Sequence, residues 1–171
     1  MPFPHQDLES VWSAWMPITG ALGITVAEMG DARLSLGMPL DPNRNYQGTV
    51  FGGSMAALAT LAGWSAIWLV MQRSGVEASL LVQDSSIRYH HPARSDLLAT
   101  AEYPDRVEWD AAIATLQRRS RVRLPMRVAM HDADGLLVAE FEGRYVLAAR
   151  QRTEDGERGT ETADGSPISD L

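Results

Sequence analysis

The stretch GSMAALATLAGWSAIWLVMQRS, residues 53–74, carries no charge before Arg73 and is followed by Gly75. Glycine commonly ends a helix, and a helix of this length would extend about 33 Å at 1.5 Å per residue. Such a helix is either a membrane span, which needs about 20 apolar residues, or the core of a soluble domain. Serine, threonine, glycine and alanine dilute its hydrophobicity, and no cluster of Lys or Arg flanks it. We therefore predict a buried core helix and no membrane span.

Shorter periodic segments lie on both sides of this helix. Alternating apolar residues bounded by turn residues predict strands at Gly23–Met29, Ala32–Pro39, Ser79–Tyr89, Asp96–Glu102, Arg121–His131 and Leu136–Ala149. Apolar residues at helical spacing predict short helices at His5–Trp15 and Arg106–Arg118. Strands grouped before and after one long helix favour an α+β fold with an antiparallel sheet over an alternating βαβ layout.

The composition describes an ordinary soluble domain, with 171 residues of which 45% are hydrophobic and 22% charged. The net charge of −7 disfavours nucleic acid as a partner, because such binding rests on Lys and Arg contacts to phosphates. The chain has no cysteine, which excludes disulfides and a thiol nucleophile. Residues 1–7 lack the features of a signal peptide, so we expect a cytoplasmic protein. Residues 1–150 are predicted to form the domain, and the acidic tail 151–171 to be disordered.

The loop before the long helix is the segment most suited to form a binding or catalytic site. It reads NYQGTVFGGS, residues 45–54, and places two adjacent glycines at the helix N-terminus. Free backbone N–H groups at that position carry partial positive charge from the helix dipole and suit an anion or a developing oxyanion. The alternative is that Gly52 and Gly53 only permit a tight turn against the sheet.

The loop also carries a family resemblance. The pattern Asn45-x-x-Gly48-x-x-Phe51-Gly52-Gly53 resembles the N-x-x-G-x-x-H-G-G motif of hotdog-fold thioesterases that act on acyl-CoA. Residues 49–69 resemble the YiiD C-terminal type of thioesterase domain, and the likeness covers about 15–149. It implies a hotdog fold, in which a long central helix is wrapped by an antiparallel sheet of about five to six strands. It also implies a homodimer that binds its acyl-CoA or acyl-ACP substrate at the subunit interface. A tetramer stays open, because exposed sheet faces can pair in several ways, and no cofactor is expected.

The chain departs from that pattern at two positions. The usual histidine is Phe51, and Thr60 stands where an Asp or Glu often follows on the helix. A hydrolase needs a group that accepts a proton from water, so three residues are candidates. Asn45 would position water, Thr60 would hydrogen-bond water or the thioester, and Asp84 is the carboxylate near the motif in the family layout. Each residue also has a structural alternative. Asn45 could only cap a turn of the loop, Thr60 could be a core residue bonded to its own helix, and Asp84 could be an exposed surface residue.

The remaining site expectations concern the substrate. The Gly53 amide, with Gly52, is expected to stabilise the oxyanion. The residues assigned to substrate binding are Phe51, Gly52, Ser54, Trp64 and Arg88. A basic cluster at Arg118–Arg127 would bind coenzyme A phosphates or form intersubunit ion pairs. Its members Arg119, Arg121, Arg123 and Arg127 would share one face of a continuous strand. The pair His90-His91 is interpreted as exposed, because adjacent strand residues point to opposite faces and do not share a metal.

Two functions remain open, and no metal is expected for either. The first is hydrolysis of acyl-CoA or acyl-ACP thioesters. The second is a non-catalytic acyl-thioester-binding or dimerisation module of hotdog fold. A hotdog dehydratase is disfavoured, because the histidine expected in the loop is replaced by Phe51.

Overall fold

The computed structural model describes residues 5–149, so the predicted disordered tail at 151–171 lies outside the described residues. The helices are α1 (His5–Trp15), α2 (Ile18–Ala21), α3 (Gly52–Ser74) and α4 (Arg106–Arg119), with a 3-10 turn η1 at Asp41–Asn43. The strands are β1 (Thr25–Met29), β2 (Arg33–Met38), β3 (Ala78–Tyr89), β4 (Leu97–Glu102), β5 (Arg121–Asp132) and β6 (Leu137–Ala149). Every predicted helix and strand is present, with bounds shifted by two residues at most.

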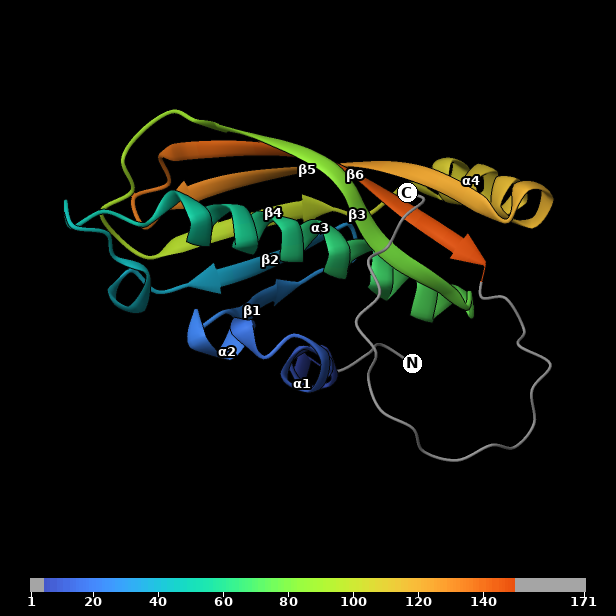
Figure 1. Ribbon diagram of the computed structural model, residues 1–171, viewed down its shortest axis with the longest axis horizontal. Helices are drawn as coiled ribbons and strands as arrows, with labels where there is room; N and C mark the ends of the chain where they lie inside the picture. Colours follow the sequence, from blue (N-terminus) through green and yellow to red (C-terminus); the bar gives the residue numbers. More distant parts are fainter. Residues whose placement is uncertain (1–4, 150–171) are drawn as a thin grey trace, which may run out of the picture.

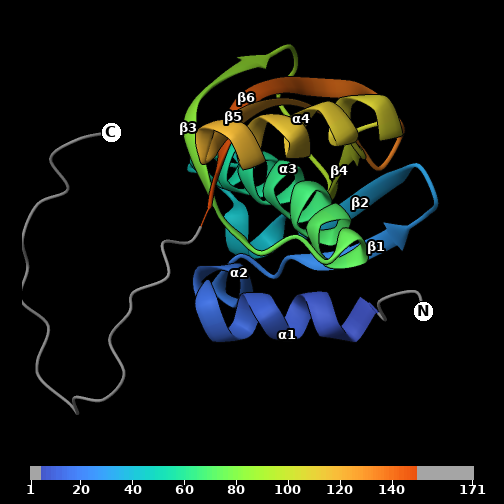
Figure 2. The same ribbon diagram turned by 90° about the vertical axis from the view of Figure 1, so that its right-hand side faces the viewer.

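The six strands form one antiparallel sheet in the order β1-β2-β4-β5-β6-β3. The sheet curls around α3, so that the helix runs along its concave side (Figure 1). Strands β1 and β3 are the two edges of the sheet, and α1 and α2 lie below α3 (Figure 2). The predicted architecture is confirmed: an α+β fold with a long central helix wrapped by an antiparallel sheet.

Helix α3 is the core of the domain. It is long and apolar enough to cross a membrane, but 72% of its most apolar stretch is buried inside the domain. Seven of its side chains are completely shielded from solvent, namely Leu58, Ala59, Ala62, Ser65, Ala66, Ile67 and Leu69. The helix ends at Gly75, which adopts the left-handed conformation (φ 64°) and donates its N–H to the Gln72 carbonyl. The sequence-based interpretation of a core helix is therefore confirmed.

One glycine brings α3 close to the sheet. A Cβ at Gly63 would lie 2.5 Å from the Tyr145 hydroxyl, so only glycine leaves room for that side chain. Tyr145 Oη donates a hydrogen bond to the Thr60 carbonyl at 2.7 Å, and burial raises the pKa of Tyr145. This contact fixes the height of α3 above β6 at the level of Thr60.

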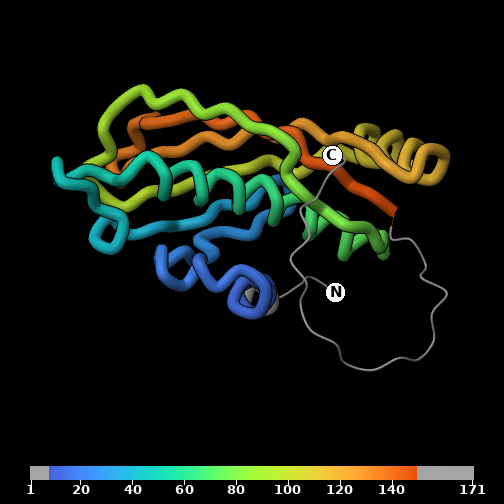
Figure 3. The backbone as a smooth tube through the Cα atoms, in the orientation of Figure 1, coloured from blue at the N-terminus to red at the C-terminus, as the bar shows by residue number. Residues whose placement is uncertain are grey.

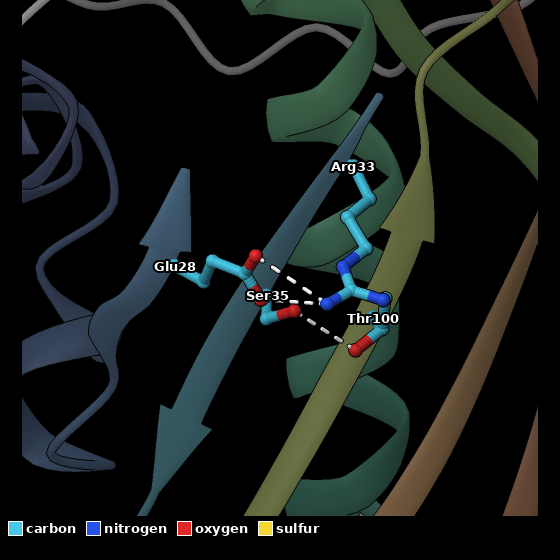
Figure 4. Close-up of polar contacts among 4 residues, drawn as sticks. All are labelled: Glu28, Arg33, Ser35 and Thr100. Carbon is cyan, nitrogen blue, oxygen red and sulfur yellow. Dashed lines mark hydrogen bonds and ion pairs between the residues drawn. The ribbon is translucent and has the colours of Figure 1, made fainter. Parts of the chain in front are cut away.

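The outer face of the sheet, which is the face turned away from α3, is polar. On β2 and β4, Ser35 and Thr100 lie opposite one another and their hydroxyls are 2.9 Å apart (Figure 4). Beside them, Arg33 forms an ion pair with Glu28 of β1 at 3.2 Å. Further along the sheet, Arg127 pairs with Glu142 at 3.0 Å. These pairs account for the alternation of apolar and polar residues in the sequence.

One detail of the predicted strand pattern is wrong. Arg119 belongs to the last turn of α4, and Ser120 ends that helix in the left-handed conformation (φ 57°). Strand β5 therefore begins at Arg121, and Arg119 does not share a strand face with the other arginines. The chain reverses at Ser120 because a left-handed residue closes the helix and redirects the backbone into β5.

Candidate functional site

The loop before α3 is built by Asn45. Its Oδ1 accepts hydrogen bonds from the Gln47 and Thr49 amides at 2.9 and 3.2 Å, and its Nδ2 donates to Thr49 Oγ1 at 2.9 Å. Its backbone N–H donates to the Thr49 carbonyl at 2.8 Å, and Gly48 takes a positive φ of 76° to close the turn. Asn45 therefore shapes the loop that leads into α3, as side chains of this type often do.

The N-terminus of α3 has no side-chain cap. The Phe51 amide donates to the Asn43 carbonyl at 2.7 Å, and the first helical hydrogen bond runs from the Met55 amide to the Phe51 carbonyl at 3.1 Å. Within residues 5–149, the amides of Gly52, Gly53 and Ser54 consequently have no acceptor. Three N–H groups with partial positive charge thus converge at the helix end. Gly53 is exposed, and Ser54 is buried beneath it.

Aromatic side chains explain both glycines. A Cβ at Gly53 would overlap the Phe51 ring, and a Cβ at Gly52 would lie 3.2 Å from the Tyr89 hydroxyl. Tyr89 Oη donates to the Gly52 carbonyl at 2.8 Å, and burial raises the pKa of Tyr89. The glycine pair therefore admits two aromatic rings beside the free amides, which a tight turn alone would not require.

A stripe of α3 leads away from these amides. The α3 stripe comprises Gly53, Ala56, Ala57, Thr60 and Trp64, which share one helix face and are half-buried or exposed. The hydroxyl of Thr60 has no hydrogen-bond partner among the described residues. Trp64 stacks on Trp68 with ring centroids 6.0 Å apart, and its Nε1 donates to the Leu80 carbonyl at 3.2 Å.

The α3 stripe ends at a cavity of about 530 Å³. Its walls are mainly aromatic and aliphatic and include Trp15, Trp64, Trp68, Met71 and Leu80. Cavities of this size with apolar walls are typical of small-molecule sites. Trp15 lies at the mouth with 65% of its surface exposed.

The structure does not bring Asp84 or Arg88 to the helix N-terminus of the same chain. Both belong to β3 and lie opposite exposed residues of β6, Arg144 and Glu140, so their side chains point to the outer face of the sheet. Asp84 is engaged there by Arg144, with oxygen–nitrogen distances of 2.7 and 2.8 Å. This hydrogen bond also raises the pKa of Arg144. A carboxylate on the face opposite α3 is remote from the Gly53 amide of its own chain.

The basic cluster is likewise used on the outer face. Arg127 pairs with Glu142, and Arg123 Nε donates to Gln83 Oε1 at 2.7 Å. Within the described part of the chain, no group of three or more His, Asp or Glu side chains is arranged to hold a metal ion. His90 Nε2 lies within hydrogen-bonding distance of Glu140 Oε2, at 2.8 Å.

Sequence reasoning missed a second segment that lies against the helix N-terminus. The Val50 amide donates to the Ala93 carbonyl at 2.9 Å, which joins the loop before α3 to the residues that follow β3. Figure 3 shows that the two connections lie at the same end of the domain. The available signal was Tyr89, an aromatic residue at the end of a strand, followed directly by two histidines and Pro92.

A long apolar helix enclosed by a curled antiparallel sheet, with a glycine-bearing loop at its N-terminus, defines the hotdog class of thioesterase folds. The chain belongs to the family described as "Putative thioesterase (yiiD_Cterm)", which matches residues 5–149.

Solved structures agree with this assignment. A putative thioesterase from Shewanella oneidensis has 30% identity and a TM-score of 0.76, covering 84% of this chain and 96% of that one. A protein of unknown function from Chlorobaculum tepidum has 23% identity and a TM-score of 0.81, covering 85% and 94%. A thioesterase (EC 3.1.2.-) from Haemophilus influenzae has 16% identity and a TM-score of 0.67, covering 90% and 97%. The last two likenesses establish the fold alone.

Proposed function

We propose that this protein hydrolyses acyl thioesters of coenzyme A or acyl-carrier protein. The observation that carries the proposal is the set of three unpaired amides at the start of α3, which open onto the half-buried α3 stripe. When water attacks a thioester, its carbonyl oxygen becomes an oxyanion, and backbone amides aimed at that oxygen lower the barrier. Gly53 supplies the exposed amide, while Phe51, Gly52 and Ser54 surround the carbonyl end of the substrate.

A panel of acyl-CoA and acyl-ACP substrates of increasing chain length tests this function, with the released thiol as the readout. The chain has no cysteine, so every thiol detected comes from the product. We expect turnover for at least one chain length. Binding of the whole panel without thiol release would contradict hydrolysis and would favour a non-catalytic acyl-thioester-binding or dimerisation module.

The polar residues of the site divide into two roles. Asn45 acts by holding the loop that presents the amides, because its side chain makes its hydrogen bonds to Gln47 and Thr49 of that loop. Thr60 has a free hydroxyl on the α3 stripe and hydrogen-bonds the thioester or a water. Arg88 has no ion-pair partner among the described residues and remains a candidate for a phosphate of the carrier.

Asp84→Asn is expected to keep turnover within about two-fold of the unaltered protein, because a general base must lie within about 3 Å of its water or one water away. The carboxylate instead points to the outer face and pairs with Arg144. Steady-state thiol release measures the effect. A loss of about ten-fold or more would place Asp84 in the site of a second copy.

We further propose that the acyl tail follows the α3 stripe into the cavity walled by Trp64 and Trp68. Trp64→Leu is expected to favour longer tails, because each additional buried methylene contributes about 0.8 kcal/mol, about four-fold in kcat/KM. The ratio of kcat/KM for a long and a short acyl chain measures this effect. General damage to the fold would lower both values together and leave the ratio unchanged.

The site is proposed to be completed in a homodimer formed through β3. This strand is a sheet edge, and its residues Leu81 and Val82 expose 61% and 41% of their surfaces. An exposed apolar edge strand next to a half-buried helix face is a surface that a second copy would cover. Two such dimers could also pair through the charged outer faces of their sheets to form a tetramer. The light-scattering experiment described next distinguishes a dimer from a tetramer.

Single cysteines test the dimer cleanly in this cysteine-free chain. If two β3 edges pair about a two-fold axis near Ser85, Ser85→Cys or Ser86→Cys forms a disulfide with its own copy under mild oxidation. Ser79→Cys is the matched control, since its two copies would be about 40 Å apart at 3.3 Å per residue. Light scattering is expected to give twice the 18.7 kDa of the chain, or four times for a tetramer. A monomer would contradict the proposal.

A further inference from the structure

No side chain that could act as a general base is evident beside the free amides of α3. Two carboxylates of the loops beside the helix N-terminus are engaged: Asp41 contacts Arg44 at 3.5 Å, and Asp96 accepts the Leu40 amide at 2.9 Å. Asp84 is on the outer face of the sheet, and Thr60 is not a base. A group that takes a proton from water must therefore come from another segment.

The segment after β3 is held firmly against the helix N-terminus. Tyr89 is bonded to the Gly52 carbonyl, and the Ala93 carbonyl accepts the Val50 amide. Between these two points, the amides of His90 and His91 donate to the Val138 carbonyl of β6 at 2.9 and 3.3 Å. The backbone that carries the two histidines is thus tied to the loop of the site on one side and to the sheet on the other.

A cavity of about 320 Å³ lies between this segment and the first turn of α3. Its walls include Gly52, Met55, Tyr89, His90 and His91. The titratable groups in this wall are Tyr89, His90 and His91, and α3 contributes none. Tyr89 is already a hydrogen-bond donor, and His90 is engaged by Glu140. The ring of His91 is exposed and has no partner among the described residues.

We propose that His91 is the general base of this thioesterase, acting on a water held in the cavity it shares with Gly52. The proposal rests on the proposed hydrolysis and supplies its missing proton acceptor. Imidazole is the side chain most often used for this purpose in enzymes. It also explains how the site operates with Phe51 in the place of the histidine of the family pattern: the imidazole comes from the end of β3.

The step balances without a cofactor. A ring nitrogen of His91 takes a proton from water as the water oxygen bonds to the thioester carbon, and the carbonyl electron pair moves onto oxygen. The oxyanion is stabilised by the amides at the start of α3. When it collapses, the carbon–sulfur bond breaks, and the thiolate takes the proton from the imidazolium. The products are a carboxylic acid and the free thiol of the carrier.

His91→Ala tests this role. We expect kcat for acyl-CoA hydrolysis to fall by about 10²-fold or more with little change in KM, because general-base catalysis typically contributes 10²–10⁴-fold. Imidazole added to the buffer is expected to restore about ten-fold, since the emptied site has room for the ring. The matched control is His131→Ala, whose side chain lies on the outer face of β5 opposite the exposed Leu98. It should retain full turnover and show no response to imidazole.

Binding separates this proposal from the proposed function. A coenzyme A S-alkyl thioether, which cannot be hydrolysed, is added to the unaltered protein and to His91→Ala, with tryptophan fluorescence as the readout. Equal binding with lost turnover supports the role of His91. Full turnover by His91→Ala, or a loss that imidazole does not reverse, would overturn that role and leave hydrolysis standing. An unaltered protein that binds the thioether but hydrolyses no substrate would overturn the proposed function, and the base with it.

Discussion

Gly53→Pro is expected to lower kcat for acyl-thioester hydrolysis by about 10²- to 10³-fold, the usual effect of removing one oxyanion donor. Proline has no N–H, so the substitution deletes the exposed amide directly. The fold should tolerate it, because that amide has no acceptor in the helix and proline fits the first turn of a helix. The preceding Gly52 has no Cβ to collide with the proline ring.

The control is Gly53→Ala, which adds the Cβ but keeps the amide. In both variants this atom would displace the Phe51 ring, whose surface is 57% exposed and free to move outward. Gly53→Ala is therefore expected to lose far less activity than Gly53→Pro, and thermal unfolding should report similar stabilities. Equal losses of kcat in the two variants would show that ring displacement, and not the amide, governs turnover.

The pattern of the sequence predicts the architecture well for a physical reason. Residues 53–74 are apolar on nearly all faces, which is the signature of a helix enclosed on every side. The strands alternate because one face packs on α3 and the other carries pairs such as Ser35 with Thr100. These signals depend on neighbouring residues only, so they can be interpreted from the sequence without knowledge of the fold. The helix end at Ser120 is the exception, because serine, unlike glycine, rarely adopts the left-handed conformation and so gives no warning of it.

The candidate site is harder to predict from the sequence, because it depends on contacts between segments that are distant in the chain. Asp84 is near the motif in the family layout, but the facing of β3 carries its side chain to the outer surface, where Arg144 engages it. A single bulge between Val82 and Asp84 interrupts the alternation of that strand, and facing cannot be inferred across it. His91 illustrates the opposite case. The sequence predicts an exposed residue, and His91 is exposed. What the sequence does not indicate is the bond between Val50 and Ala93, which brings this segment to the start of α3.

The two aromatic contacts at the glycine pair refine the meaning of the motif. Gly52 leaves room for Tyr89, and Gly53 leaves room for Phe51. A histidine at position 51 would place a polar ring where Phe51 now presents an apolar one. The loop of this chain leaves the amides at the start of α3 without acceptors among the described residues, while the Phe51 ring cannot transfer a proton. For this reason we propose that the base comes from another segment.

Trp12→Ala is expected to lower the free energy of unfolding by about 3 to 5 kcal/mol, the range found for removing a large aromatic side chain from a core. Trp12 is 1% exposed, and its Nε1 donates to Ser65 Oγ of α3 at 3.1 Å. The variant would leave a cavity between α1 and α3 and a buried hydroxyl without its partner. Urea unfolding followed by circular dichroism measures the loss as a lower transition midpoint.

Trp15→Ala is the matched control for this prediction, since it makes the same change one turn later in the same helix. Trp15 is 65% exposed, so its loss should cost under about 1 kcal/mol. Ser65→Ala separates the hydrogen bond from the packing and is expected to cost about 1 kcal/mol. If Trp12→Ala and Trp15→Ala shift the midpoint equally, α1 does not close the open side of the sheet beneath α3. A large difference between them means that the buried tryptophan holds this helix on the core and thereby supports the wall of the Trp64 cavity.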